Sequence, residues 1–191
     1  MPRAGLDRDQ VVATAADIAD AEGLDAVTLA RVAAALGVKS PSLYNHVAGR
    51  DGLLHGVALA GLGALAAQLR EAAIGRAGTE ALVETAEAYR RYVKEHPGRY
   101  AAGAVRAPDP GDAEHVAAAS AVLGVMRGVL RGWDLSEDET IHALRGFRAA
   151  VHGFASLEAA GGFGLELDLD TSFRRLITAL AAGFGAERRP G

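Results

Sequence analysis

Residues 28–54 read TLARVAAALGVKSPSLYNHVAGRDGLL, and this stretch decides the fold of the N-terminal part of the chain. Leu29, Val32, Ala33 and Leu36 recur at helical spacing, which predicts a short helix with one buried face. Gly37 comes directly after them, and glycine readily takes the positive φ that ends a helix. The stretch therefore predicts a helix followed by a tight turn.

A second short helix is expected after the turn. Ser40 precedes Pro41, which predicts an N-cap residue followed by a proline at the first helical position. The helix should cover about residues 41–47, with Leu43 and Val47 packed inward. Its outward side chains would be Ser42, Tyr44, Asn45 and His46. Two helices joined by a glycine turn indicate a helix-turn-helix for DNA, the alternative being a helical hairpin within a core.

Charge is segregated along the same segment. No acidic residue lies between Asp25 and Asp51, whereas Arg31, Lys39 and Arg50 are basic. The acids that precede the segment are Asp7, Asp9, Asp17, Asp20, Glu22 and Asp25. The whole chain has a net charge of −4, so nucleic-acid binding must depend on this local patch.

The remaining sequence predicts an all-α fold. Half of the 191 residues are hydrophobic, only 5% are aromatic, and the apolar pattern has a period near 3.6 residues. Asp7 with Gln10, and Ser136 with Glu139, have the spacing of helix-starting capping boxes. About nine helices are predicted, over residues 8–22, 29–36, 41–47, 49–73, 79–96, 100–106, 112–131, 136–160 and 171–184.

Several classes of protein are disfavoured. The absence of cysteine excludes disulfides and thiol chemistry, and the N-terminus has no signal-peptide pattern. We find no uncharged apolar run of the length that spans a membrane, so a cytoplasmic protein is expected. Glu139 and His142 form half of a di-iron motif, but no second copy exists, so no metal, cofactor or enzymatic activity is expected.

Residues 1–50 are predicted to form a DNA-binding domain, residues 51–186 a ligand-binding and dimerisation domain, and residues 187–191 a flexible tail. The first 47 residues are too few to bury a sizeable core alone, so they should pack against the helix that follows. That helix would link the two parts mechanically.

The chain resembles the TetR family of bacterial transcriptional repressors. The resemblance rests on Thr28–Ala33, Leu36–Val38, Ser42–Val47 and Arg50–Leu54, which occur in the right order and spacing. The C-terminal half is similar to a WHG-type subgroup through Phe147–Phe154, Leu157–Glu158, Gly161–Phe163 and Ser172–Phe173. One departure is the turn Ala48–Gly49, where many members carry a proline or a polar residue.

The resemblance implies an all-helical homodimer that binds a near-palindromic operator and a small-molecule effector. It places Lys39, Ser40, Pro41, Ser42, Tyr44 and His46 at the DNA, with Thr28 and Arg50 near the phosphate backbone. Side-chain chemistry makes Lys39 and Asn45 the strongest readers of base edges. Asn45 could instead face the following helix, so Lys39 is the preferred contact to guanine.

Two further sets of residues are candidates in the C-terminal half. An effector pocket is predicted from Tyr89, Tyr92, Met126, Trp133, Phe147, Arg148 and His152, with ordinary core packing as the alternative. A dimer interface is predicted from Val151, Phe154, Leu157, Phe173, Leu176, Leu180 and Phe184, because large apolar stripes need cover. The rival functions are a helical enzyme or carrier, an activator, and a sequence-independent nucleoid protein.

Overall fold

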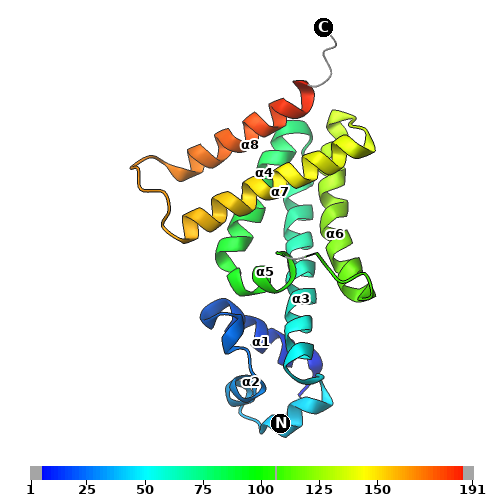
Figure 1. Ribbon diagram of the computed structural model, residues 1–191, viewed down its shortest axis with the longest axis vertical. Helices are drawn as coiled ribbons and strands as arrows, with labels where there is room; N and C mark the ends of the chain where they lie inside the picture. Colours follow the sequence, from blue (N-terminus) through cyan, green and yellow to red (C-terminus); the bar gives the residue numbers. More distant parts are fainter. Residues whose placement is uncertain (1–5, 106, 187–191) are drawn as a thin grey trace. The chain divides into compact units, whose positions relative to one another are not determined.

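The computed structural model describes residues 6–105 and 107–186, and all regular structure within these ranges is helical (Figure 1). The α-helices are α1 (Arg8–Glu22), α2 (Leu29–Leu36), α3 (Gly49–Ala73), α4 (Gly78–Glu95), α5 (Pro97–Gly103), α6 (Ala113–Leu130), α7 (Glu137–Ala159) and α8 (Leu169–Ala186). The short 3₁₀ helices are η1 (Leu24–Ala26), η2 (Ser40–Asn45) and η3 (Arg131–Trp133). The predicted all-α class is confirmed.

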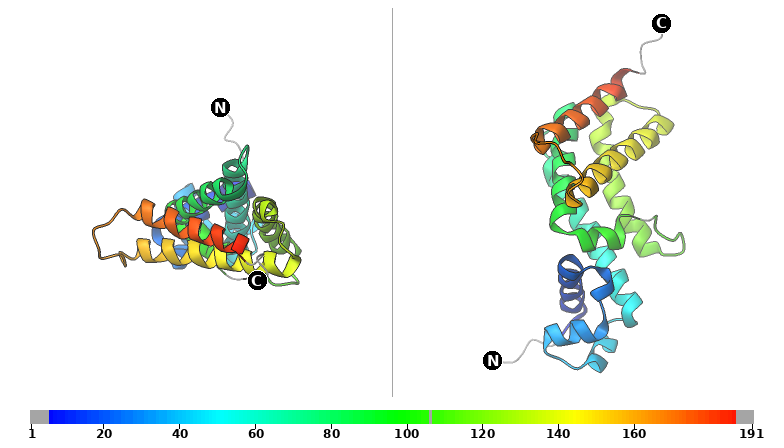
Figure 2. Two further views of the ribbon diagram at one scale, coloured as in Figure 1. Left: turned by 90° about the horizontal axis from the view of Figure 1, so that it is seen from above. Right: turned by 60° about the vertical axis from the view of Figure 1, so that its left-hand side comes forward.

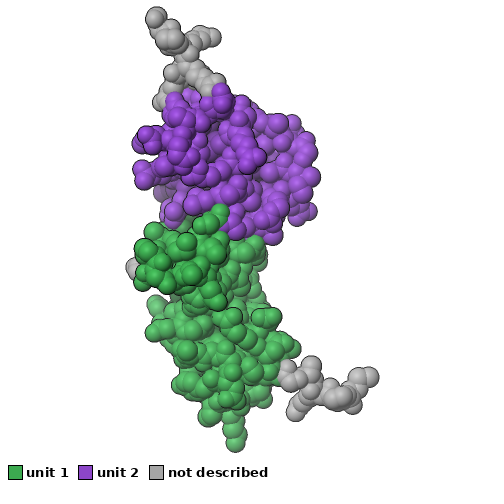
Figure 3. All heavy atoms as spheres, turned by 90° about the vertical axis from the view of Figure 1, so that its right-hand side faces the viewer, with its two compact units in different colours: residues 1–64, 95–120 green, residues 65–94, 121–191 purple. Residues whose placement is uncertain are grey.

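The chain divides into two compact units (Figure 3). Unit 1 contains residues 1–64 and 95–120, and unit 2 contains residues 65–94 and 121–191. The division falls within α3, which supplies residues to both units. The functional division at residue 50 stays a prediction, and residues 187–191, predicted as a tail, lie outside the described residues.

The predicted helix starts are explained by local hydrogen bonds. The Asp7 carboxylate accepts a hydrogen bond from the Gln10 amide at 2.7 Å, which caps α1. Ser136 and Glu139 cap α7 reciprocally, since each side chain accepts a hydrogen bond from the other residue's amide. These bonds satisfy amides that have no partner inside the helix, so the sequence pattern predicts the boundary.

Unit 1 has a small aliphatic core. Its buried side chains come mainly from α1, α2, η2 and the first half of α3, and include Val11, Ala15, Val32, Leu43, Leu53 and Val57. The helix α5 packs closely on α1 within the same unit. A Cβ atom added at Gly98 would lie 2.1 Å from both the carbonyl carbon and the oxygen of Ala19. Only glycine allows this backbone approach.

The predicted short helix at residues 100–106 was misplaced. The structure starts α5 at Pro97 and ends it at Gly103, and residue 106 lies outside the described residues. Pro97 occupies the first turn, where its fixed φ suits a helix and its missing amide hydrogen costs nothing. The sequence Pro97–Gly98 therefore opens α5, directly after the end of α4 at Glu95.

Unit 2 contains the helical hairpin of α7 and α8, which run side by side (Figure 2). Phe147, Val151 and Phe154 of α7 are buried, as are Phe173 and Ile177 of α8. The apolar face of each helix is thus used largely inside the chain's own core. Only the remaining apolar residues of the hairpin are available to a partner.

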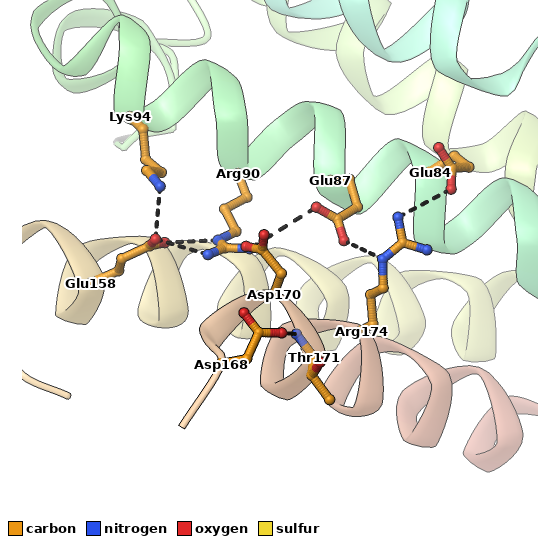
Figure 4. Close-up of polar contacts among 9 residues, drawn as sticks. All are labelled: Glu84, Glu87, Arg90, Lys94, Glu158, Asp168, Asp170, Thr171 and Arg174. Atoms are coloured by element: carbon orange, nitrogen blue, oxygen red, sulfur yellow. Dashed lines mark hydrogen bonds and ion pairs between the residues drawn. The ribbon is translucent and has the colours of Figure 1, made fainter. Parts of the chain in front are cut away.

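An ion-pair cluster around the buried Arg90 holds α4 against this hairpin (Figure 4). Arg90 of α4 is only 3% exposed and forms two hydrogen bonds with the Glu158 carboxylate, at 2.7 and 2.8 Å. Its guanidinium also donates to Asp170 at 2.8 Å and lies about 5 Å from the rings of Phe154 and Phe173. The cluster therefore ties α4 to both α7 and α8.

The cluster predicts a loss of stability in acid. Hydrogen bonds from Arg90 and Lys94 lower the pKa of Glu158 from 4.5 to about 2. Because the pKa of Glu158 is lower in the folded chain than in the unfolded chain, the ionised carboxylate stabilises the fold above pH 4.5. This stabilisation is lost as the pH falls from about 4.5 towards 2. We expect Glu158 to reduce the free energy of unfolding by about 2 kcal/mol between pH 6 and pH 3.

Urea unfolding at both pH values measures this effect. The Glu158→Gln variant is the control, because its side chain does not titrate. The difference in stability between the native chain and this variant should shrink in acid. A difference that is the same at both pH values would contradict the role assigned to the Glu158 carboxylate.

Two stretches are long and apolar enough to cross a membrane by length and composition alone, although the sequence predicted none: Gly49–Ala73 and Ala113–Trp133. Half of the apolar window in the first is buried, as expected for a core helix. In the second, which covers α6 and η3, only 17% of the window is buried. The helix α6 thus combines an apolar composition with a largely uncovered surface.

Candidate functional site

The first helix of the helix-turn-helix is α2, and both of its ends match the sequence expectation. Thr28 caps its start, since the side-chain oxygen accepts a hydrogen bond from the Arg31 amide at 3.1 Å. Gly37 ends it in the left-handed conformation at φ 68°, with its amide directed to the carbonyl oxygens of Ala33 and Ala34. This geometry turns the chain sharply towards η2.

The second helix differs from the predicted α-helix over residues 41–47. It is the 3₁₀ helix η2, and its bonds join residues three apart, as from the Ser42 amide to the Lys39 carbonyl at 2.9 Å. Ser40 is the first helical residue, and no side chain caps this end, so the predicted Ser40 N-cap is wrong.

The outer face of η2 is polar and aromatic, whereas its inner face is buried. Leu43 is fully buried and Val47 nearly so, as predicted. Tyr44 is 63% exposed, which is unusual for a large aromatic side chain in a folded domain. Of the other predicted DNA contacts, Lys39, Pro41, Ser42 and Asn45 are exposed, and Ser40 and His46 are half-buried.

Charge on this face is concentrated at Lys39. Arg31 forms a bidentate contact with Glu22, at 2.6 and 3.3 Å, and this hydrogen bonding lowers the pKa of the Glu22 carboxyl. Lys39, in contrast, has no ion pair within the described part of the chain. Its ammonium group is therefore available for a phosphate or for a guanine edge.

Thr28 and Arg50 have structural duties besides the predicted contacts to the DNA backbone. The Thr28 hydroxyl accepts a bond as the N-cap of α2, and its own hydrogen can still be donated to a phosphate. The Arg50 guanidinium donates to the carbonyl oxygens of Val27 and Leu24, each at 2.9 Å. Arg50 thus holds the start of α3 against η1, a role that the sequence did not reveal.

Unit 2 contains a cavity of about 670 Å³ among the end of α3, the start of α4 and the second half of α6. Its lining residues are Arg70, Ala73, Ile74, Arg76, Ala77, Gly78, Ala81, Ala121, Gly124, Val125, Gly128, Val129, Arg131 and Gly132. Sequence reasoning missed this site. Its three arginines come from three separate segments, so no local spacing pattern marks them.

None of the seven residues predicted for an effector pocket lines this cavity. Tyr89, Tyr92, Met126 and Phe147 are buried, and the rings of Tyr89 and Phe147 lie 6.3 Å apart. Trp133 is half-buried and donates a hydrogen bond to the Ala181 carbonyl of α8 at 3.1 Å. Of the remaining two, Arg148 is exposed and His152 is half-buried.

The predicted dimer-interface residues fall into three groups by burial. Val151, Phe154 and Phe173 are buried within unit 2, so they cannot form an exposed interface, and their prediction is corrected to core packing. Leu157 and Leu176 are exposed. Leu180 and Phe184 are half-buried and line a shallow hollow between α7 and α8.

The Glu139–His142 pair is used in part for helix capping. Glu139 is engaged in the cap of α7, as its spacing from Ser136 predicts. Within residues 6–105 and 107–186, no three metal-ligating side chains lie close enough to hold an ion.

Comparison with known proteins gives matches along most of the chain. The family described as "Bacterial regulatory proteins, tetR family" matches residues 11–57, and "Tetracyclin repressor-like, C-terminal domain" matches residues 82–180. The chain is 36% identical over 187 residues to the HTH-type transcriptional regulator Rv0681 of Mycobacterium tuberculosis, covering 97% of this chain and 84% of that protein. It is 34% identical over 182 residues to the HTH-type transcriptional regulator YobS of Bacillus subtilis, covering 95% and 94% of the two chains.

The fold is also similar to that of solved structures. A minocycline-bound TetR variant from Acinetobacter baumannii AYE aligns with a TM-score of 0.68 and 23% identity, over 97% of this chain and all of the other.

Proposed function

Since the chain belongs to the TetR family of transcriptional regulators, we propose that it is a cytoplasmic, non-enzymatic repressor that binds operator DNA as a homodimer and is released by a small-molecule effector. The observation that carries this proposal is the outer face of η2. Tyr44 and Ser42 are exposed there, Lys39 is exposed directly before the helix, and the fully buried Leu43 anchors the helix from beneath. A fixed backbone with exposed donors suits the major groove.

The proposed operator is a near-palindrome. In a two-fold dimer the second helices of the two motifs would be about 34–36 Å apart, one turn of B-DNA. The exposed Leu157 and Leu176 of the α7–α8 hairpin are our candidates for the dimer contact. Apolar side chains of this size gain from being covered by a second copy.

Effector release would act through α3. This helix begins two residues after Val47, which packs beneath η2, and it ends at the cavity of unit 2. A ligand that favours one position of α3 would change the orientation in which η2 meets the DNA. A coupling free energy of about 1–3 kcal/mol, typical of allostery, would weaken operator binding roughly 5- to 150-fold. The minocycline complex of the structural neighbour supports an effector site in this fold.

Lys39 and Arg50 should have different roles in DNA binding. We expect Lys39→Ala to reduce discrimination between operator and scrambled DNA by about 1–3 kcal/mol, with no change in melting temperature. Arg50→Ala should weaken binding to all sequences about equally and lower the salt slope by about one. It should also lower the melting temperature, because it removes two hydrogen bonds to backbone carbonyls. Fluorescence anisotropy at several salt concentrations, together with thermal unfolding, measures both effects.

Arg8→Ala is the matched control, since Arg8 is exposed on the first turn of α1. It should change neither the preference for operator nor the melting temperature. Unaltered sequence discrimination in Lys39→Ala would remove Lys39 as the reader of a base.

A further inference from the structure

The lining of the cavity in unit 2 consists of an apolar wall and three arginine side chains. Eleven of its lining residues are glycine, alanine, valine or isoleucine, and they offer no side-chain hydrogen bond. The other three are Arg70 of α3, Arg76 of the α3–α4 turn and Arg131 of η3. Aspartate and glutamate are absent from the lining. The site thus combines an apolar surface with positive charge alone.

The three arginines are not equally available. Arg76 donates to the Ala72 carbonyl at 3.0 Å and lies 3.7 Å from the Glu80 carboxylate. Much of the hydrogen-bonding capacity and charge of its guanidinium is therefore already engaged by neighbouring residues. Arg70 and Arg131 have no ion pair in the described ranges. Two guanidinium groups can therefore donate charge-assisted hydrogen bonds to an acidic group.

The wall contributed by α6 is unusually open. Gly124 and Gly128 both line the cavity, and a Cβ added at either position would meet nothing within 4 Å. A Cβ at either place would therefore project into open space. These glycines leave room along the helix that an apolar ligand body can fill.

We propose that this cavity binds an apolar anion, with an aliphatic or aromatic body along Gly124 and Gly128 and an acidic head held by Arg70 and Arg131. A volume of about 670 Å³ suits a small organic molecule. A neutral ligand of the same shape would gain the apolar contacts but not the charge-assisted bonds. The binding is independent of the proposed function, and only the further step, that such a ligand releases DNA, rests on it.

The test compares decanoate with decanol, which share a chain length and differ in the charge of the head. Isothermal titration calorimetry on the full chain should give about tenfold tighter binding for decanoate. Arg131→Gln and Arg70→Gln should each weaken decanoate binding about tenfold and leave decanol binding unchanged. Arg145→Gln, at an exposed position of α7 outside the cavity, is the control and should alter neither.

Filling the cavity provides a second, independent test. Gly128→Leu should fold normally, because leucine has a better helix propensity and open space to occupy, yet it should lose binding of both probes. Gly63→Leu is the matched control, since Gly63 is an exposed helical glycine with the same open surroundings but lies outside the cavity. Unchanged decanoate affinity in Gly128→Leu and in both arginine variants would overturn the proposal, as would equal affinity for decanoate and decanol.

Failure of this inference can be told apart from failure of the proposed function. Decanoate binding that depends on Arg70, Arg131 and Gly128 but leaves DNA binding unaffected would support the site and contradict the effector role. Equal affinity for decanoate and decanol, unchanged in the cavity variants, would overturn the site, and release of DNA by another compound would then leave the repressor proposal standing.

Discussion

Replacing Glu158 by alanine is expected to lower the free energy of unfolding by about 3 kcal/mol, because it leaves a buried charge without its main partner. Arg90 is only 3% exposed and has two of its hydrogen bonds to this carboxylate. The remaining carboxylate contacts are weaker, since Asp170 is largely exposed and Glu87 lies 4.0 Å away. Chemical denaturation of the full chain, followed by circular dichroism, measures the loss.

Lys94→Ala is the control for this prediction. Lys94 contacts the same carboxylate at 2.7 Å but is about half exposed, so its removal should cost less than about 1 kcal/mol. The double variant Arg90→Met with Glu158→Leu, which removes both charges, should recover much of the loss. A double variant as unstable as Glu158→Ala would contradict the explanation by an uncompensated charge.

Gly98→Ala should be at least as damaging, although it adds a single methyl group. The new Cβ would lie 2.1 Å from the backbone of Ala19 and 2.6 Å from the Asp20 amide nitrogen, and neither atom can rotate away. The helix α5 would have to move off α1, at a cost of about 3 kcal/mol or more, and would disturb the ion pairs between the two helices. Thermal unfolding and limited proteolysis of the full chain measure this effect.

The interface at risk is well defined. Asp20 of α1 accepts a hydrogen bond from the Arg99 amide at 2.9 Å and contacts His96 at 3.0 Å, and Asp17 pairs with Arg99 at 2.6 Å. Gly63→Ala is the matched control, because a Cβ there meets nothing within 4 Å and alanine favours the helix. It should be neutral or slightly stabilising, and an equal loss in both variants would contradict the packing argument.

Features set by a few neighbouring residues were predictable from the sequence. Thr28, Gly37 and the Ser136–Glu139 pair act through bonds to amides or carbonyls within five residues, so their spacing alone indicates helix ends. The inward positions of Leu43 and Val47 follow in the same way from periodicity. Each of these predictions is confirmed.

The errors arose where proline acts or where distant residues meet. Pro97 stands in the first turn of α5 and starts a helix earlier than expected, and η2, which contains Pro41, is a 3₁₀ helix where an α-helix was expected. Arg50 bonds to carbonyls more than 20 residues away, and no local pattern reveals that contact. The cavity is hidden for the same reason, since its walls come from segments about 50 residues apart.

The prediction of a dimer interface failed in part for a different reason. An apolar stripe on a helix indicates that the face is covered, but not by what. Val151, Phe154 and Phe173 are covered by their own chain. Leu157 and Leu176 remain exposed, so they stay candidates for contact with a second copy.

The measurement that tests the central claim most directly is selection of binding sites from a random-sequence DNA pool with the purified full chain, at about 150 mM salt, where non-specific binding is weak. The account predicts enrichment of a palindromic sequence whose half-sites lie about one helical turn apart, bound by two copies of the chain. It also predicts that Lys39→Ala loses much of that enrichment. Two results would contradict the claim that the protein is a sequence-specific regulator that reads DNA through the exposed face of η2. One is that no sequence is enriched over the starting pool, and the other is that Lys39→Ala binds the enriched sequences equally well.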